Sequence, residues 1–156
     1  MNTLAVEKRT VPVSIRFEDG HSVTGDIYLS PIAQKHLGRE TVMDFMNTDQ
    51  NFFPLKLSPD SRVIMINKAR VVEVTVAMDI EFGDTDLAAL GAKEEPMTVM
   101  FQCDYHLAGT AYIEMPPRKS RIIDFLNGGS GFFLLKSGDR AHILNSQHIS
   151  YVTPGR

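Results

Sequence analysis

The sequence predicts a mainly β protein with short helices, in which one small five-stranded unit occurs twice. The segment "DFMNTDQNFFPLK" at 44–56 returns in closely similar form as "DFLNGGSGFFLLK" at 124–136. Apolar and polar residues alternate in the segments on either side, which is typical of half-buried strands. An internal repeat is a stronger indicator of the fold than any single motif, so the fold class is predicted from the two copies.

Each copy predicts the order strand, strand, helix, strand, strand, tight turn, strand. The dipeptide Asp19-Gly20 between two alternating segments is a favoured hairpin turn. The short helices rest on apolar residues at i, i+3 and i+4, such as Val42, Phe45 and Met46 in the first copy. In the first copy we expect strands at 11–17, 22–29, 52–57, 62–68 and 70–76 and a helix at 41–47. In the second copy we expect strands near 97–101, 107–113, 132–136, 140–146 and 148–152 and a helix at 121–127.

The matched positions divide the chain into a first unit at 11–76, an acidic connector at 77–96 and a second unit at 97–153. The connector region is the most charged part of the chain, since residues 78–96 hold six acidic residues against one lysine. We expect a solvated linker here. Apolar residues occupy every even position from Val72 to Phe82, which predicts that the first unit's last strand continues toward the second unit.

The units resemble small SH3-like and Sm-like barrels, because five short strands end in a pair joined by a tight turn. The segment "FEDGHSVTGDIYL" at 17–29 is similar to the first hairpin of Sm-like proteins, where a glycine allows strong bending; Gly25 and Gly109 fill that position. In Sm proteins the helix precedes the first strand, whereas here it is expected between the second and third. The doubled pattern also resembles an uncharacterised bacterial family of tandem small β-barrel domains, a resemblance that implies no known activity.

Catalytic and metal-binding patterns are sparse in the sequence. The single cysteine, Cys103, cannot form an intramolecular disulfide, and it is expected to be buried and structural. On a strand it would face away from His106, so this pair does not suggest a nucleophile and its base. The five histidines are scattered without metal-ligand spacing. We expect no enzyme activity, no metal and no cofactor, and the lack of a long apolar run predicts a cytoplasmic protein.

A few polar residues remain as candidates for a ligand or partner site. The basic cluster "PPRKSR" at 116–121 could meet a phosphate or an acidic partner, or could be a solvated loop with Ser120 as helix N-cap. The matched aspartates and asparagines could form a symmetric site, or could bond nearby backbone and charged neighbours. The candidates are Arg118, Lys119, Arg121, Asp44, Asp124, Asn67 and Asn145.

These observations favour a non-enzymatic interaction or small-ligand-binding module whose partner is another protein or a small ligand. One alternative is a nucleic-acid-binding protein of the Sm-like kind, and another is an enzyme of unknown class. The net charge of −3 and the single basic cluster make nucleic acid the less favoured partner, since nucleic-acid binders usually carry a basic stripe.

Overall fold

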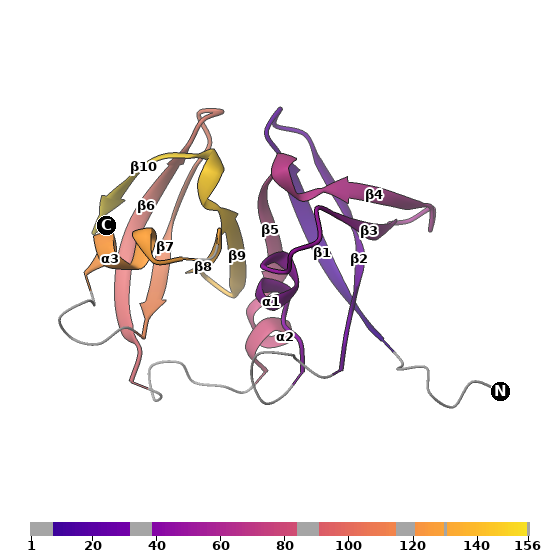
Figure 1. The fold of residues 1–156 in the computed structure, drawn as a ribbon, viewed down its shortest axis with the longest axis horizontal. Coiled ribbons are helices and arrows are strands. Elements are labelled where there is room, and N and C mark those ends of the chain that lie inside the picture. The colour runs from indigo at the N-terminus through magenta and orange to yellow at the C-terminus, as the bar shows by residue number, and fades with distance from the viewer. Residues whose placement is uncertain (1–7, 32–38, 84–90, 115–120, 130, 156) are drawn as a thin grey trace.

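The computed structural model describes residues 8–31, 39–83, 91–114, 121–129 and 131–155 (Figure 1). Ten antiparallel strands form one unclosed sheet with a few short helices beside it, which confirms the prediction of a mainly β fold. The strands are β1 (Arg9–Phe17), β2 (Ser22–Leu29), β3 (Phe52–Leu57), β4 (Val63–Asn67), β5 (Val71–Ala77), β6 (Lys93–Phe101), β7 (His106–Ile113), β8 (Phe132–Ser137), β9 (Arg140–Asn145) and β10 (Ile149–Pro154). The helices are α1 (Val42–Met46), α2 (Met78–Phe82) and α3 (Ile122–Asn127), with 3₁₀ turns at Lys68–Arg70 and Ser146–His148.

The two halves of the sheet have the same order of strands. The first half runs β5-β1-β2-β3-β4 and the second runs β10-β6-β7-β8-β9. They meet where β5 pairs with β9, and Figure 1 shows these two strands side by side in the middle of the molecule. Within the described residues the pairings therefore form one open sheet of two similar halves.

Three glycines are required by the backbone, one in a turn and two where neighbouring strands lie very close together. Gly20 adopts a φ of 93° in the turn between β1 and β2, as the predicted hairpin requires. A Cβ on Gly25 would collide with the carbonyl oxygen of Lys56 on β3, and one on Gly109 would collide with that of Lys136 on β8. Only glycine lets the second strand of each half pack this tightly on the third.

Helix α1 is fixed at both ends by side chains. Thr41 and Asp44 form a capping box, in which the Thr41 hydroxyl accepts from the Asp44 amide and the Asp44 carboxylate accepts from the Thr41 amide. At the other end the buried Lys68 ammonium donates to the carbonyl oxygens of Phe45 and Thr48, at 3.1 Å and 3.2 Å. A cation at a helix C-terminus offsets the partial negative charge there.

The long strand expected through residue 82 is wrong, because β5 ends at Ala77 and α2 follows. The buried carboxylate of Glu81 accepts hydrogen bonds from the Val42 and Met43 amides at 2.7 Å and 2.9 Å, so α2 caps the N-terminus of α1. The expectation of a solvated connector is therefore wrong for Glu81. Residues 84–90 of the connector lie outside the described residues, and β6 already begins at Lys93.

The hydrophobic cores of the two halves exchange residues across the β5·β9 pairing. The core of the first half includes Leu134, Ala141 and Ile143 from the second half. The core of the second half includes Val72 from β5. Each half therefore completes its core with side chains of the other, and units of this small size are expected to need such support.

The doubled aromatic residues have different environments. Phe45 and Phe53 meet edge to face at 5.3 Å between ring centroids, and Phe125 and Phe133 do the same at 5.6 Å. The aromatic pairs 52–53 and 132–133 look like core residues in the sequence, but 57% of the Phe52 surface is exposed, so Phe52 is not a core aromatic. Among the described residues, no helix has both the length and the apolar character that a membrane span needs.

The buried ring of Phe53 provides a test of this core. We expect Phe53→Ala to lower the free energy of unfolding by about 3–5 kcal/mol, because the change empties a site in which the ring is 1% exposed. Chemical denaturation measures this. The control Lys56→Ala, on the same strand, should cost less than about 0.5 kcal/mol. Equal effects of the two changes would contradict the assigned core.

Candidate functional site

A pocket of about 380 Å³ lies between the two halves, where residues of three helices meet β8. Five aromatic side chains line it, from α2, β7, α3 and β8: Phe82, Tyr112, Phe125, Phe132 and Phe133. This size lies within the range of small-molecule sites, which are concave and mostly apolar with a few polar groups. The pocket is therefore the candidate functional site.

Few polar groups face this pocket. The Asn47 amide bridges to β8, since its Nδ2 donates to the Phe132 carbonyl at 3.1 Å and its Oδ1 accepts from the Phe132 amide at 3.0 Å. Glu114, just after β7, is exposed and is the one acidic residue among the described residues that line the pocket. Asn47 thus joins the two halves at the pocket wall, and Glu114 gives the pocket a negative side.

A polar cluster also lies between the halves, around the Glu73 carboxylate. Glu73 is 4% exposed and accepts from the Tyr105 hydroxyl at 2.7 Å, His142 Nδ1 at 3.0 Å and Arg16 Nε at 3.3 Å. The Arg16 guanidinium lies 4.1 Å from the centre of the Tyr105 ring, a cation–π distance. Two residues of this cluster come from each half, so it fixes the halves against one another.

The cluster changes the acidity of its members. Burial alone would raise the pKa of Glu73, but the hydrogen bonds from His142, Tyr105 and Arg16 outweigh it and hold that pKa below its ordinary value. Burial, followed by the hydrogen bond to Glu73, raises the pKa of the Tyr105 hydroxyl. Glu73 is therefore a buried carboxylate and Tyr105 remains a hydrogen-bond donor.

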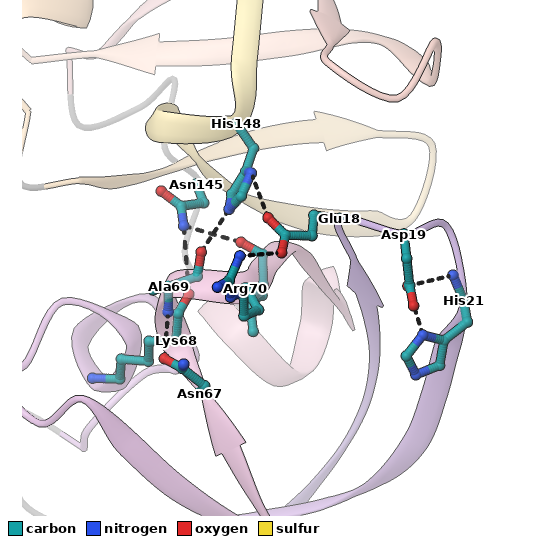
Figure 2. Close-up of polar contacts among 10 residues, drawn as sticks. Glu18, Asp19, His21, Asn67, Lys68, Ala69, Arg70, Asn145 and His148 are labelled. Carbon is teal, nitrogen blue, oxygen red and sulfur yellow. Dashed lines mark hydrogen bonds and ion pairs between the residues drawn. The ribbon is translucent and has the colours of Figure 1, made fainter.

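Further contacts between the halves involve the 3₁₀ turn Lys68–Arg70 of the first half. Figure 2 shows Asn145 and His148 pointing from the second half toward this turn. The Asn145 Nδ2 donates to the Val71 carbonyl at 3.0 Å, and His148 Nε2 lies 2.6 Å from the Ala69 carbonyl. On its other side His148 faces Glu18, which also pairs with Arg70.

The matched aspartates and asparagines lie at helix starts and tight turns. Asp44 belongs to the capping box of α1, and Asp124 pairs with Arg121 at 3.0 Å. Asn67 and Asn145 each accept a hydrogen bond from the amide two residues on, at 3.1 Å, and have negative φ angles. These are the local bonds expected from the sequence, and the four residues do not gather into one cluster in the contacts described.

The basic cluster is only partly described. Arg118, Lys119 and the suggested cap Ser120 lie outside the described residues. Arg121 is the N-cap residue of α3, and its exposed guanidinium is bound to Asp124, which raises the pKa of Arg121. Arg121, the one basic residue of this cluster that the structure describes, is therefore already paired with a carboxylate.

The prediction that Cys103 is buried is wrong, because the residue is exposed in the turn between β6 and β7. It lines a small pocket of about 220 Å³ together with Glu18 and His148. No hydrogen bond joins Cys103 to His148 among the contacts described. Among the described residues, no group of three or more histidine, cysteine or carboxylate side chains is placed to hold a metal ion.

Sequence reasoning missed Phe82 and Tyr112 as pocket residues. Phe82 ends the alternating segment that predicts a long strand, and Tyr112 lies in an ordinary strand pattern that carries no signal of a site. Their approach to Phe132 depends on how the two halves pack, which local patterns do not show. No protein-family model matches the chain, and neither a curated protein nor a solved structure matches it.

The Glu73 cluster predicts a pH-dependent stability. Because the pKa of Glu73 is lower in the folded chain than the ordinary 4.5, its carboxylate stabilises the fold above pH 4.5. That contribution is lost as the pH falls through the folded value. We expect Glu73→Gln to lower the free energy of unfolding by about 1–3 kcal/mol near neutral pH. The difference from the unaltered protein should shrink below pH 4.5.

Denaturant unfolding across this pH range measures both effects. The matched control is Glu94→Gln, an exposed carboxylate on β6, which should change stability by less than about 0.5 kcal/mol. If Glu73→Gln matches the unaltered protein at neutral pH, the cluster does not hold the halves together.

Proposed function

We propose that the protein is a non-enzymatic binding module of the cytoplasm, made of two SH3-like or Sm-like units, and that it takes a small ligand in the aromatic pocket. The observation that carries the proposal is the convergence of five aromatic rings from both halves on one cavity of about 380 Å³. The shared strand order of the halves, with a 3₁₀ turn between the last two strands of each, supports the assignment to small barrels.

The lining indicates the chemistry of the ligand. Aromatic faces favour flat, apolar groups and attract cations, because their π-faces are negative. Glu114 adds a carboxylate to the same pocket. The pocket thus fits a small aromatic ligand, or an aromatic group of a partner protein, that carries a positive charge.

Three indole compounds of different charge test this proposal. We expect tryptamine, a cation, to bind more tightly than neutral indole, and indole more tightly than the anion indole-3-acetate. Titrations followed by amide chemical shifts, with Gly129 and Phe132 as reporters, locate the binding. Phe82→Ala should weaken tryptamine about 3- to 10-fold through lost ring contact.

The control for charge is Glu114→Gln, which keeps the pocket's shape and should remove the preference for tryptamine over indole. The control for position is Lys56→Ala, outside the pocket, which should leave both affinities unchanged. Shifts that avoid the pocket residues, or equal affinities for all three compounds, would contradict the proposal.

Nucleic acid is the alternative partner, and we predict that it binds weakly. Phosphate contacts supply most non-specific affinity, and the chain is acidic while the described Arg121 is already paired with Asp124. Fluorescence anisotropy with labelled single-stranded RNA and DNA should give dissociation constants weaker than about 1 μM at physiological salt. Tighter binding that is lost in an Arg118→Ala, Lys119→Ala, Arg121→Ala variant would favour the nucleic-acid alternative.

A further inference from the structure

The sheet ends in two edges of the same kinds as those that meet at its centre. At the centre β5, the fifth strand of the first half, pairs with β9, the fourth strand of the second half. The outer edges are β4, the fourth strand of the first half, and β10, the fifth strand of the second half. Figure 1 shows them on opposite sides of the molecule. The chain therefore carries one complete pairing of these two kinds of edge in its middle, the β5·β9 pairing or inner joint. It also carries one unpaired edge of each kind at its two ends.

The correspondence of the edges extends to irregular details. Strand β5 bulges against β1 so that Val72 is skipped, and β10 bulges against β6 so that Ser150 is skipped. Strands β4 and β9 both end at an asparagine that caps a 3₁₀ turn, with nearly identical backbone angles at Asn67 and Asn145. These landmarks align each outer edge with its inner counterpart residue by residue.

Side chains that the inner joint buries have apolar, exposed counterparts on the outer parts of the molecule. Ala141 and Ile143 on β9 are fully buried, whereas their counterparts Val63 and Met65 on β4 are 48% and 66% exposed. Glu73 on β5 is 4% exposed and its counterpart on β10 is 58% exposed Tyr151. Two further pairs have a half-buried inner member, with Phe52 as the counterpart of Phe132 and Ile123 as the counterpart of Met43. These outer residues are all of the large hydrophobic side chains that are exposed in the described part of the chain: Phe52, Val63, Met65, Ile123 and Tyr151.

We propose that β4 of one copy pairs with β10 of a second copy, in the antiparallel register that joins β9 to β5 within the chain. The inner pairs Glu73–Leu144 and Val74–Ile143 then correspond to Tyr151–Ile66 and Val152–Met65 between copies. Pro154 has no amide hydrogen, so the outer ladder ends earlier than the inner one. The occupant is a second copy because each edge already has its matched partner edge on the same chain.

Two asparagines support this pairing. At the inner joint the Asn47 amide binds the backbone of Phe132, and the Asn145 amide binds the Val71 carbonyl. Their counterparts, the Asn127 side chain and the Asn67 Nδ2, have no hydrogen-bond partner among the described residues. In the proposed joint Asn127 binds the backbone of Phe52, and Asn67 binds the Ile149 carbonyl of the neighbouring copy.

The proposed β4·β10 pairing between copies, the outer joint, is more apolar than the inner joint. The positions of Arg16, Glu73 and His142 in the inner cluster correspond to Met100, Tyr151 and Ile64. Interfaces between identical subunits are richer in apolar residues than other protein surfaces. Because the two edges differ, the contact is head to tail, and it gives a ring where the rotation closes and a filament where it does not.

Two single substitutions at exposed positions test the pairing. Met65→Lys blocks β4 and leaves β10 intact, whereas Tyr151→Lys blocks β10 and leaves β4 intact. Light scattering coupled to size-exclusion chromatography should show an oligomer for the unaltered protein and a monomer for each variant. An equimolar mixture of the two variants should give a dimer with twice the monomer mass, since one intact edge of each kind remains.

The matched control is Thr24→Lys, at an exposed position of the inner strand β2, which should keep the mass of the unaltered protein. Circular dichroism checks that each variant is folded, and Val63→Lys replaces Met65→Lys if that variant unfolds. A monomeric unaltered protein at every concentration would overturn the proposal. So would a dimer of either variant alone, which indicates like-with-like edges, or a mixture that stays monomeric.

Discussion

The pairing of β5 with β9 is the interaction on which the rest of this structure depends. Without it the sheet separates into two five-stranded halves, each of which lacks part of its core, because Ile143 enters the first core and Val72 the second. The aromatic pocket depends on it as well. Its walls come from α1 and α2 on one side and from β7, α3 and β8 on the other, so the pocket exists only while the halves are held together.

The joint combines an apolar ladder with a buried carboxylate. Removing Glu73 from water is unfavourable, and three donors from both halves must be correctly placed to compensate for it. A displaced register would leave this charge without partners in an apolar environment. The ladder and the exchanged core residues supply affinity between the halves, while the carboxylate restricts them to one relative position, and hence fixes the geometry of the pocket.

The sequence predicted what depends on local chemistry and missed what depends on packing between the halves. Strand alternation, the Asp19-Gly20 turn and the short helices all follow from neighbouring residues, and the structure has them. Alternation could not show that β5 ends at Ala77, because Glu81 forms its helix-capping bonds with residues 39 and 38 positions away. Phe52 and Phe53 look equivalent in sequence, but only Phe53 faces the core. Cys103 was assigned from its residue type alone, and the turn that exposes it overrides that tendency.

The contrast between the inner joint and the outer edges follows from chain connectivity. Two halves of one chain meet at a high effective concentration, so their joint can include a charged cluster that contributes more to specificity than to affinity. Separate copies lose translational and rotational freedom on association and need a larger favourable contribution from each contact. Apolar side chains provide it, and at the outer edges Tyr151, Met100 and Ile64 stand where the inner joint has Glu73, Arg16 and His142. The same backbone edge can thus serve a joint within a chain or between chains, with the side chains at three positions setting the difference.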